Sequence, residues 1–277
     1  LKNLVKSFNE KEIINIKSNI FKKHENLNFK ESCDYNFLLI LLYFNLKKSE
    51  YFKFLNLLKD ETYLDFGDYF INIDDYKITS DKVVSLLDLE SIENFSKIKN
   101  QKILEIGAGS GRTSECILSI KNLKSYTICD IPPAIYISYK RMKQAFPNKN
   151  IELLIDIEDE IDLNEKIKKN DINFIFPHQI KKIQKELFDL TIGIDCFHEM
   201  DKSTINFYFE NITNISNKFY FSIWSKTKNW YSANIFKRTE RLDFEKGDYP
   251  IPSSWELKFK NELKFPSNQL GIGYIVK

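Results

Sequence analysis

The chain has 277 residues, which fits one large domain or a catalytic domain with a smaller addition. Its hydrophobic content of 43% is sufficient for a sizeable core. The net charge is only +2, and of the 41 basic residues four are arginine, so the composition disfavours nucleic acid and anionic membranes as partners.

The cysteines indicate a reducing compartment. The chain has four of them, with no Cys-x-x-Cys pair, at Cys33, Cys116, Cys129 and Cys196. Three fall within predicted core elements, as buried free thiols do. No signal-peptide pattern is visible near Leu1, and the most apolar run, 37–44, is too short to cross a bilayer. We therefore expect a cytoplasmic protein without a membrane span.

The first hundred residues have helical patterns and no chemical motif. The expected segments are an amphipathic helix over 1–25, a helix capped by Asp34 and running to Leu58, loops or a short hairpin over 63–76, and a helix over 82–89 capped by Ser80 and Asp81. We predict that residues 1–95 form a helical extension, acting as a lid or a dimerisation element, and that residues 96–277 form the main domain.

A glycine turn organises this main domain. Residues 102–106 form a short apolar run typical of a buried parallel strand, and a helical pattern begins at Thr113. Between them Gly107, Gly109 and Gly111 occupy alternate positions. Such a strand, turn and helix lets the backbone approach a ligand closely at a helix N-terminus. Glu105 ends the strand, where a carboxylate can meet a cationic group.

The spacing of this turn separates two nucleotide-binding motifs. In the dinucleotide fingerprint a third glycine falls three positions after the second. Here that position is Arg112, which is wrong for NAD. The pattern Glu-x-Gly-x-Gly-x-Gly resembles instead the first motif of class I S-adenosylmethionine (SAM) methyltransferases. An ordinary strand-to-helix turn remains an alternative on this motif alone.

A second acid supports a nucleoside site. Residues 125–130 form the next predicted strand, and Asp130 ends it 23 residues after Gly107. An acid at about this offset, on the adjacent strand tip, is placed to accept both hydroxyls of a ribose. We therefore expect Asp130 to bind the ribose of a nucleoside cofactor.

Strands and helices then alternate, which predicts a parallel sheet with crossover helices. The strands expected after Asp130 are 172–176 (preferred to 151–155), 187–194, 218–223, 255–259 and 272–276, and the helices are 132–146, 163–169, 204–215 capped by Ser203, and 232–242. We predict an α/β, Rossmann-like fold with a seven-stranded, mostly parallel sheet whose last strand is antiparallel.

Two of the three histidines follow predicted strands three and four. They are His178 and His198. A hydroxyl that attacks a sulfonium methyl needs its proton removed, and a histidine near neutrality suits that task. We expect His198 to be the base, with Glu199 orienting it or binding the acceptor. His198 as a simple helix cap remains open. No partner at i+4 accompanies His198, so we predict no metal site.

Aromatic and basic residues follow the fifth strand. Trp224 suits stacking on a sugar, and Arg238 and Arg241, at helical spacing, suit a phosphate or diphosphate. A solvated helix face is an equally good account of these two arginines.

The chain resembles the bacterial sugar O-methyltransferases of the class I SAM-dependent superfamily. The resemblance covers about 65–277 and rests on the glycine motif 104–112, the Asp-Ile-Pro-Pro run from Asp130, Pro177-His178-Gln179, His198-Glu199-Met200 with Tyr208-Phe209, and Trp255. It implies SAM as methyl donor, S-adenosylhomocysteine as product, and a sugar or nucleotide-linked sugar as acceptor, in capsule or lipopolysaccharide biosynthesis.

Residue by residue, the resemblance and the motifs assign two sets of contacts. The cofactor set is Glu105, Gly107, Ala108, Gly109, Gly111, Asp130, Ile131, Pro177, His178, Gln179 and Asp195. The acceptor set is His198 and Glu199, with Tyr208, Trp224, Arg238 and Arg241 as further substrate contacts. The chain departs from the superfamily in having no Asp after strand three, so the adenine contact falls to Gln179 or backbone.

Other functions remain open at this point. They are a methyltransferase for a non-sugar small molecule or a nitrogen acceptor, a SAM-binding homologue without catalysis, and an NAD-linked oxidoreductase. A homodimer is compatible with the sequence, which does not decide the oligomeric state.

Overall fold

The computed structural model describes residues 28–60, 62, 69–224, 242–263 and 269–276. The chain divides into two compact units, Leu1–Leu87 with Phe265–Ser267, and Asp88–Lys264 with Asn268–Lys277. The boundary falls within helix α5 (Ser80–Phe95). The helices expected over 1–25 and 232–242 lie outside the described residues.

In the first unit, a helix and a 3-10 segment replace the single helix expected from Asp34 to Leu58. Helix α3 (Phe29–Leu46) begins after Asn28, whose side chain accepts from the Glu31 N–H at 2.9 Å while the Glu31 carboxylate accepts from the Asn28 N–H at 3.0 Å. This reciprocal cap starts the helix before Asp34. A second cap, Ser49, then begins the 3-10 helix η2 (Glu50–Leu57).

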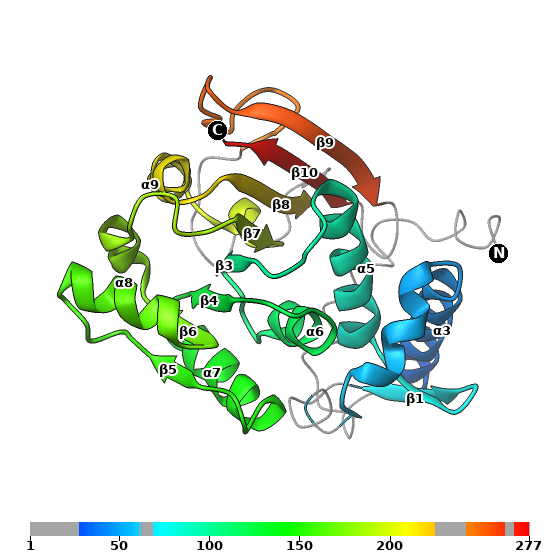
Figure 1. The fold of residues 1–277 in the computed structure, drawn as a ribbon. Coiled ribbons are helices and arrows are strands. Elements are labelled where there is room, and N and C mark those ends of the chain that lie inside the picture. Colours follow the sequence, from blue (N-terminus) through cyan, green and yellow to red (C-terminus); the bar gives the residue numbers. More distant parts are fainter. Residues whose placement is uncertain (1–27, 61, 63–68, 225–241, 264–268, 277) are drawn as a thin grey trace. The chain divides into compact units, whose positions relative to one another are not determined.

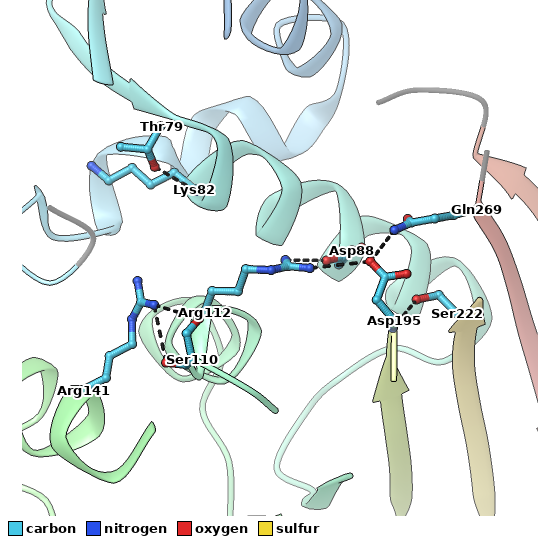
Figure 2. Close-up of polar contacts among 9 residues, drawn as sticks. All are labelled: Thr79, Lys82, Asp88, Ser110, Arg112, Arg141, Asp195, Ser222 and Gln269. Atoms are coloured by element: carbon cyan, nitrogen blue, oxygen red, sulfur yellow. Dashed lines mark hydrogen bonds and ion pairs between the residues drawn. The ribbon is translucent and has the colours of Figure 1, made fainter. Parts of the chain in front are cut away.

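A short hairpin follows, as one of the expected alternatives for this region. Strand β1 (Phe70–Ile73) pairs antiparallel with β2 (Tyr76–Thr79). The two turn residues, Asp74 and Asp75, both have positive φ angles, 48° and 66°, which gives the tight hairpin turn its twist. Thr79 rather than Ser80 or Asp81 caps α5, because its hydroxyl accepts from the Lys82 N–H at 3.1 Å (Figure 2).

The second unit is built on one eight-stranded sheet. Its strands are β3 (Lys102–Ile106), β4 (Ser125–Cys129), β5 (Ile151–Leu153), β6 (Ile172–Ile175), β7 (Leu190–Ile194), β8 (Lys218–Trp224), β9 (Glu256–Leu263) and β10 (Gln269–Ile275). Their spatial order is β5-β6-β4-β3-β7-β8-β10-β9 (Figure 1). The last strand, β10, is antiparallel to both of its neighbours, and the pairs from β5 to β8 are parallel. This confirms the predicted fold class.

The prediction of seven strands was wrong by one. Both candidates for the third strand are strands, because the segment at 151 pairs in parallel with β6 at the sheet edge, with Ile151 opposite Ile172. Helix α8 (Glu160–Lys169) connects the two, as a parallel pair requires.

The remaining helices agree closely with the expected positions. They are α6 (Arg112–Ile120), α7 (Ala134–Ala145) and α9 (Lys202–Ile215). Two short 3-10 helices, η3 (Pro177–Lys182) and η4 (Phe197–Glu199), were not expected. Helix α5 is longer than expected, and α9 is capped by Asp201 rather than Ser203, because the Thr204 N–H donates to the Asp201 carboxylate at 2.7 Å. Within the described ranges, no helix has the length and apolar character needed to cross a membrane.

Aromatic side chains form the core beside η4. Phe197 is fully buried and lies 5.5 Å from Phe209 and 5.6 Å from Phe219, measured between ring centroids in edge-to-face geometry. Gly193 makes room for it, since a Cβ there would lie 2.3 Å from the Phe197 ring. This packing fixes the short turn that carries His198.

Candidate functional site

The chain order changes direction across strand β3. From β3 the chain proceeds to β4 on one side, and later returns to β7 on the other side (Figure 1). In open α/β sheets, ligands bind beyond the carboxyl ends of the strands at such a switch point. The glycine turn after β3 and the turn after β7 both lie at this edge.

The three glycines of the turn have different surroundings. All have positive φ angles, 70° at Gly107, 58° at Gly109 and 78° at Gly111, which glycine adopts without steric cost. A Cβ at Gly107 would lie 2.6 Å from the Cβ of Cys196, whereas a Cβ at Gly109 would meet nothing within 4 Å. The backbone at Gly109 is therefore accessible to a ligand.

Asp130 points toward this turn. One carboxylate oxygen accepts the Gly109 N–H at 2.8 Å and the other accepts the N–H of Ile131 at 2.7 Å. The residue is only 8% exposed, and burial raises its pKa while the two N–H donors lower it. Each oxygen keeps a lone pair, so the carboxylate can still accept two hydroxyl groups. Ile131 beside it is 60% exposed and offers an apolar surface.

Glu105 lies near the end of β3, two residues before Gly107. Its side chain is 1% exposed, and its carboxylate accepts from the Ser114 hydroxyl and, at 2.7 Å, from the Tyr126 hydroxyl. Burial raises the pKa of Glu105 to about 7, and the two hydroxyl donors oppose that shift. The carboxylate thus links β3 to α6 and β4, the elements next to the turn. Its direct contact with a cofactor stays a prediction.

Two arginines form ion pairs around the turn, Arg141 fully buried and Arg112 partly exposed (Figure 2). Arg112 pairs with the Asp88 carboxylate at 2.7 Å. Arg141, on α7, pairs with Glu115 at 2.7 Å and donates to the Ser110 hydroxyl at 3.3 Å. Sequence reasoning missed both roles. Their signal was compositional, because these are two of only four arginines in a lysine-rich chain.

The turn after β7 begins with Asp195. Its backbone has a φ of 54°, unusual for a residue with a side chain, and its N–H donates to the Ser222 carbonyl at 3.1 Å. Its carboxylate accepts from the Gln269 amide and lies 3.9 Å from the Arg112 guanidinium. The next residue, Cys196, donates from its thiol to the Ile106 carbonyl at 3.2 Å. The Asp195 carboxylate thus binds protein groups, and a cofactor contact stays a prediction.

His198 lies at the end of this turn and stacks on an aromatic side chain. Its ring centroid is 4.9 Å from that of Trp224, with an angle of 26° between the planes. Both side chains are half-buried, and Glu199 beside them is exposed. The structure therefore brings together His198 and Trp224, two residues expected on the acceptor side.

The polar side chain of the loop after β6 binds protein groups. Gln179 is fully buried, and its amide donates to the Leu154 and Ile157 carbonyls at 2.9 Å each. Its oxygen accepts the Phe176 N–H at 2.8 Å. The Gln179 side chain thus joins two loops, and its contact with adenine stays a prediction, as does the alternative of a backbone contact. His178 is exposed, 4.0 Å from Glu158, and Pro177 begins η3.

Tyr208 packs in the aromatic core beside η4. It is 4% exposed, its ring lies 5.9 Å from Phe197, and its hydroxyl bonds to Cys129. Its expected substrate contact stays a prediction. Arg238 and Arg241 lie outside the described residues. Among the described side chains, no group of three or more His, Cys, Asp or Glu is placed to hold a metal ion.

In comparisons with known proteins, only solved structures match this chain. Neither a family model nor a curated protein matches the chain. Solved structures do match. PH0226 protein from Pyrococcus horikoshii has a TM-score of 0.50, 15% identity, and coverage of 79% of this chain and 100% of its own.

Two further neighbours score lower. A SAM-dependent methyltransferase from Aquifex aeolicus has a TM-score of 0.44 at 10% identity, over 68% of this chain and 89% of its own. The pyocyanin biosynthetic protein PhzM has a TM-score of 0.48 at 10% identity, over 82% of this chain and 62% of its own. At these identities the likeness is one of fold alone.

Proposed function

We propose that the chain is a SAM-dependent methyltransferase, with SAM as the expected cofactor. The observation that carries this proposal is Asp130, a buried carboxylate held on the Gly109 N–H at the switch point of a Rossmann-like sheet. A nucleoside needs acceptors for its ribose hydroxyls and a backbone that it can approach closely. Asp130 and Gly109 supply these two features together.

The residues at this edge fit such a cofactor. The carboxylate of Asp130 would accept the ribose hydroxyls, the exposed side chain of Ile131 would cover the base, and the open backbone at Gly109 would face the cofactor. When bound, SAM supplies a methyl group on a sulfonium centre, which weak nucleophiles attack. A dinucleotide is disfavoured, because Arg112 stands where its motif has a third glycine and is engaged in ion pairs.

On the acceptor side, we assign the proton transfer to His198 and the acceptor to a sugar hydroxyl, with S-adenosylhomocysteine as the second product. His198 is half-buried and stacked on Trp224, so the Trp224 ring restrains its orientation. Glu199 is exposed next to it, and we assign it to the acceptor side. The sugar assignment, a nucleotide-linked sugar in surface polysaccharide assembly, draws on the sequence motifs. A cytoplasmic location draws on the four scattered cysteines, and a homodimer is compatible with the sequence.

Calorimetry tests the cofactor. The protein should bind S-adenosylhomocysteine and not NAD, and Asp130→Asn should weaken binding about 10- to 100-fold, since charged hydrogen bonds to two hydroxyls are weakened. Asp162→Asn, on an exposed position of α8, is the matched control and should bind as the wild type does. Equal affinity of the wild type and the Asp130 variant would refute the proposed site.

An acceptor screen tests the reaction. Nucleotide sugars and phosphosugars are incubated with SAM, and release of S-adenosylhomocysteine is measured. With an active acceptor, His198→Gln should lower turnover about 10²- to 10⁴-fold while calorimetry shows unchanged cofactor affinity. Near-normal turnover would remove His198 as the base. Methylation of amines alone would contradict the sugar acceptor, and binding without any turnover would indicate a non-catalytic homologue.

A further inference from the structure

Arg112 lies between two carboxylates that belong to different parts of the second unit (Figure 2). It begins α6, directly after the glycine turn. Its guanidinium pairs with Asp88 at 2.7 Å and lies 3.9 Å from the Asp195 carboxylate. Asp88 is 2% exposed, so its charge needs a close partner, and Arg112 supplies it.

Asp195 is the first residue of the turn that carries His198, and four groups fix it. Its carboxylate accepts from Gln269 at the start of β10 and faces Arg112. Its N–H donates to both the carbonyl and the hydroxyl of Ser222, at 3.1 and 3.2 Å. These contacts hold its left-handed backbone, and a residue in that conformation needs such support.

The choice of arginine at this position has a physical reason. Of the 41 basic residues in the chain only four are arginine, so lysine is the usual cation here. A guanidinium presents donors in a fixed planar fork and can contact two carboxylates at once, which an ammonium on a flexible stem does less well. Arg112 uses that fork between Asp88 and Asp195.

We propose that Arg112 and Gln269 are positioning residues that act through Asp195. They fix the position of the turn that carries His198 relative to the glycine turn. The link to catalysis rests on the proposed function, in which His198 faces the acceptor. The positioning itself does not depend on a bound cofactor.

The chain offers a matched control on the same helix. Lys121, at the other end of α6, pairs with Glu93, which is also on α5 and also buried. Lys121→Met therefore removes an ion pair between the same two helices, as Arg112→Met does. A general loss of α5–α6 packing would affect both variants, whereas loss of the link to Asp195 affects only the Arg112 variant.

The test uses the imidazole signals of the protein without ligand. Nuclear magnetic resonance of ¹⁵N-histidine resolves three rings, and His198→Gln identifies the His198 signal. Arg112→Met and Gln269→Leu should shift or broaden that signal, Arg112→Lys should change it less, and Lys121→Met should leave it unchanged. His178, which is exposed, serves as the internal reference. An unchanged His198 signal in both Gln269→Leu and the Arg112 variants would overturn the proposal.

Turnover gives the second measurement. With the acceptor found by the screen, Arg112→Met and Gln269→Leu should lower kcat about 10- to 100-fold through misplacement of the base. Lys121→Met should keep wild-type kcat. If Arg112→Met does not fold, Gln269→Leu and Arg112→Lys carry the same comparison. A shifted His198 signal in a protein that does not bind S-adenosylhomocysteine would support positioning and refute the proposed function separately.

Discussion

The switch point has two sides, the proposed cofactor side around Gly109 and the proposed acceptor side around His198. They are built from different chemical groups. On the cofactor side, the glycine backbone and two buried carboxylates, Glu105 and Asp130, form the surface and its support. On the acceptor side, the groups are side chains on a short 3-10 turn and a strand end, namely His198, Glu199 and Trp224. The two carboxylates of the first side are buried, whereas the side chains of the second side are half-buried or exposed.

This difference predicts different tolerance to substitution. Burying a carboxylate or an arginine is costly unless each group keeps its partner, so a single change on the cofactor side leaves an unpaired group behind. At a half-buried position, water can hydrate a polar group that has lost its partner. We therefore expect cofactor-side variants to affect folding and binding together, and acceptor-side variants to affect turnover while the fold is maintained.

The largest expected effect comes from Arg141. Its pair with Glu115 is fully buried on both sides, so Arg141→Met should lower the free energy of unfolding by about 3–5 kcal/mol, as for other broken buried pairs. Urea unfolding measures this. The double variant Glu115→Leu with Arg141→Met should recover most of the loss, and His198→Gln should cost less than about 1 kcal/mol. Equal losses for Arg141→Met and His198→Gln would contradict the comparison.

Glu105 should give the next largest effect, as a pH dependence. Burial raises its pKa from 4.5 to about 7, so the folded protein keeps a proton that the unfolded chain releases. The free energy of unfolding should therefore fall as pH rises from about 4.5 to about 7, by about 3 kcal/mol in total.

The matched variant for this effect is Glu105→Gln, because an amide oxygen still accepts from Ser114 and Tyr126. The difference in unfolding free energy between variant and wild type, measured from pH 4.5 to 8, should move in favour of the variant as pH rises. A constant difference across that range would show that Glu105 is charged in the folded protein over the whole interval.

The sequence predicted the meeting of Gly109 and Asp130 better than the contacts of the arginines, for a physical reason. A glycine turn and a strand-end acid depend on spacing, because strand length and the parallel pairing of β3 with β4 bring Gly109 and Asp130 together. Spacing is visible in a sequence. The roles of Arg112 and Arg141 depend on partners at Asp88 and Glu115, and no local pattern indicates such pairs.

Burial and strand pairing likewise depend on contacts that are distant in the sequence. Gln179 and Tyr208 carry polar groups that suit a ligand, and their burial depends on long-range packing against Leu154 and Phe197. The additional edge strand was missed because the chain has two apolar segments of similar quality, and only their pairing decides that both join the sheet. Local propensity does not resolve either case.

A smaller effect distinguishes the strain of the glycine turn from its role in binding. Gly109→Ala should cost about 1–2 kcal/mol of stability, the usual penalty for a side chain in the left-handed region. Gly247 is the matched control, because its φ of 76° is also positive and a Cβ there also meets nothing within 4 Å. Both variants should unfold alike, and only Gly109→Ala should lose at least about tenfold in affinity for S-adenosylhomocysteine, because its methyl group blocks the approach to the backbone. Equal affinities in the two variants would place the cofactor away from Gly109.

Tyr208 should show the smallest effect and sharpen the boundary of the acceptor side. Burial raises the pKa of its hydroxyl well above the usual range, so this group stays protonated and does not act as a base at neutral pH. Tyr208→Phe keeps the packing against Phe197 and removes the hydrogen bond to Cys129, which should cost about 0.5–1.5 kcal/mol of unfolding free energy. Cofactor affinity and turnover should stay within twofold of wild type. A large loss of turnover without a change in stability would support a substrate contact by Tyr208. The acceptor site would then extend toward the core next to η4.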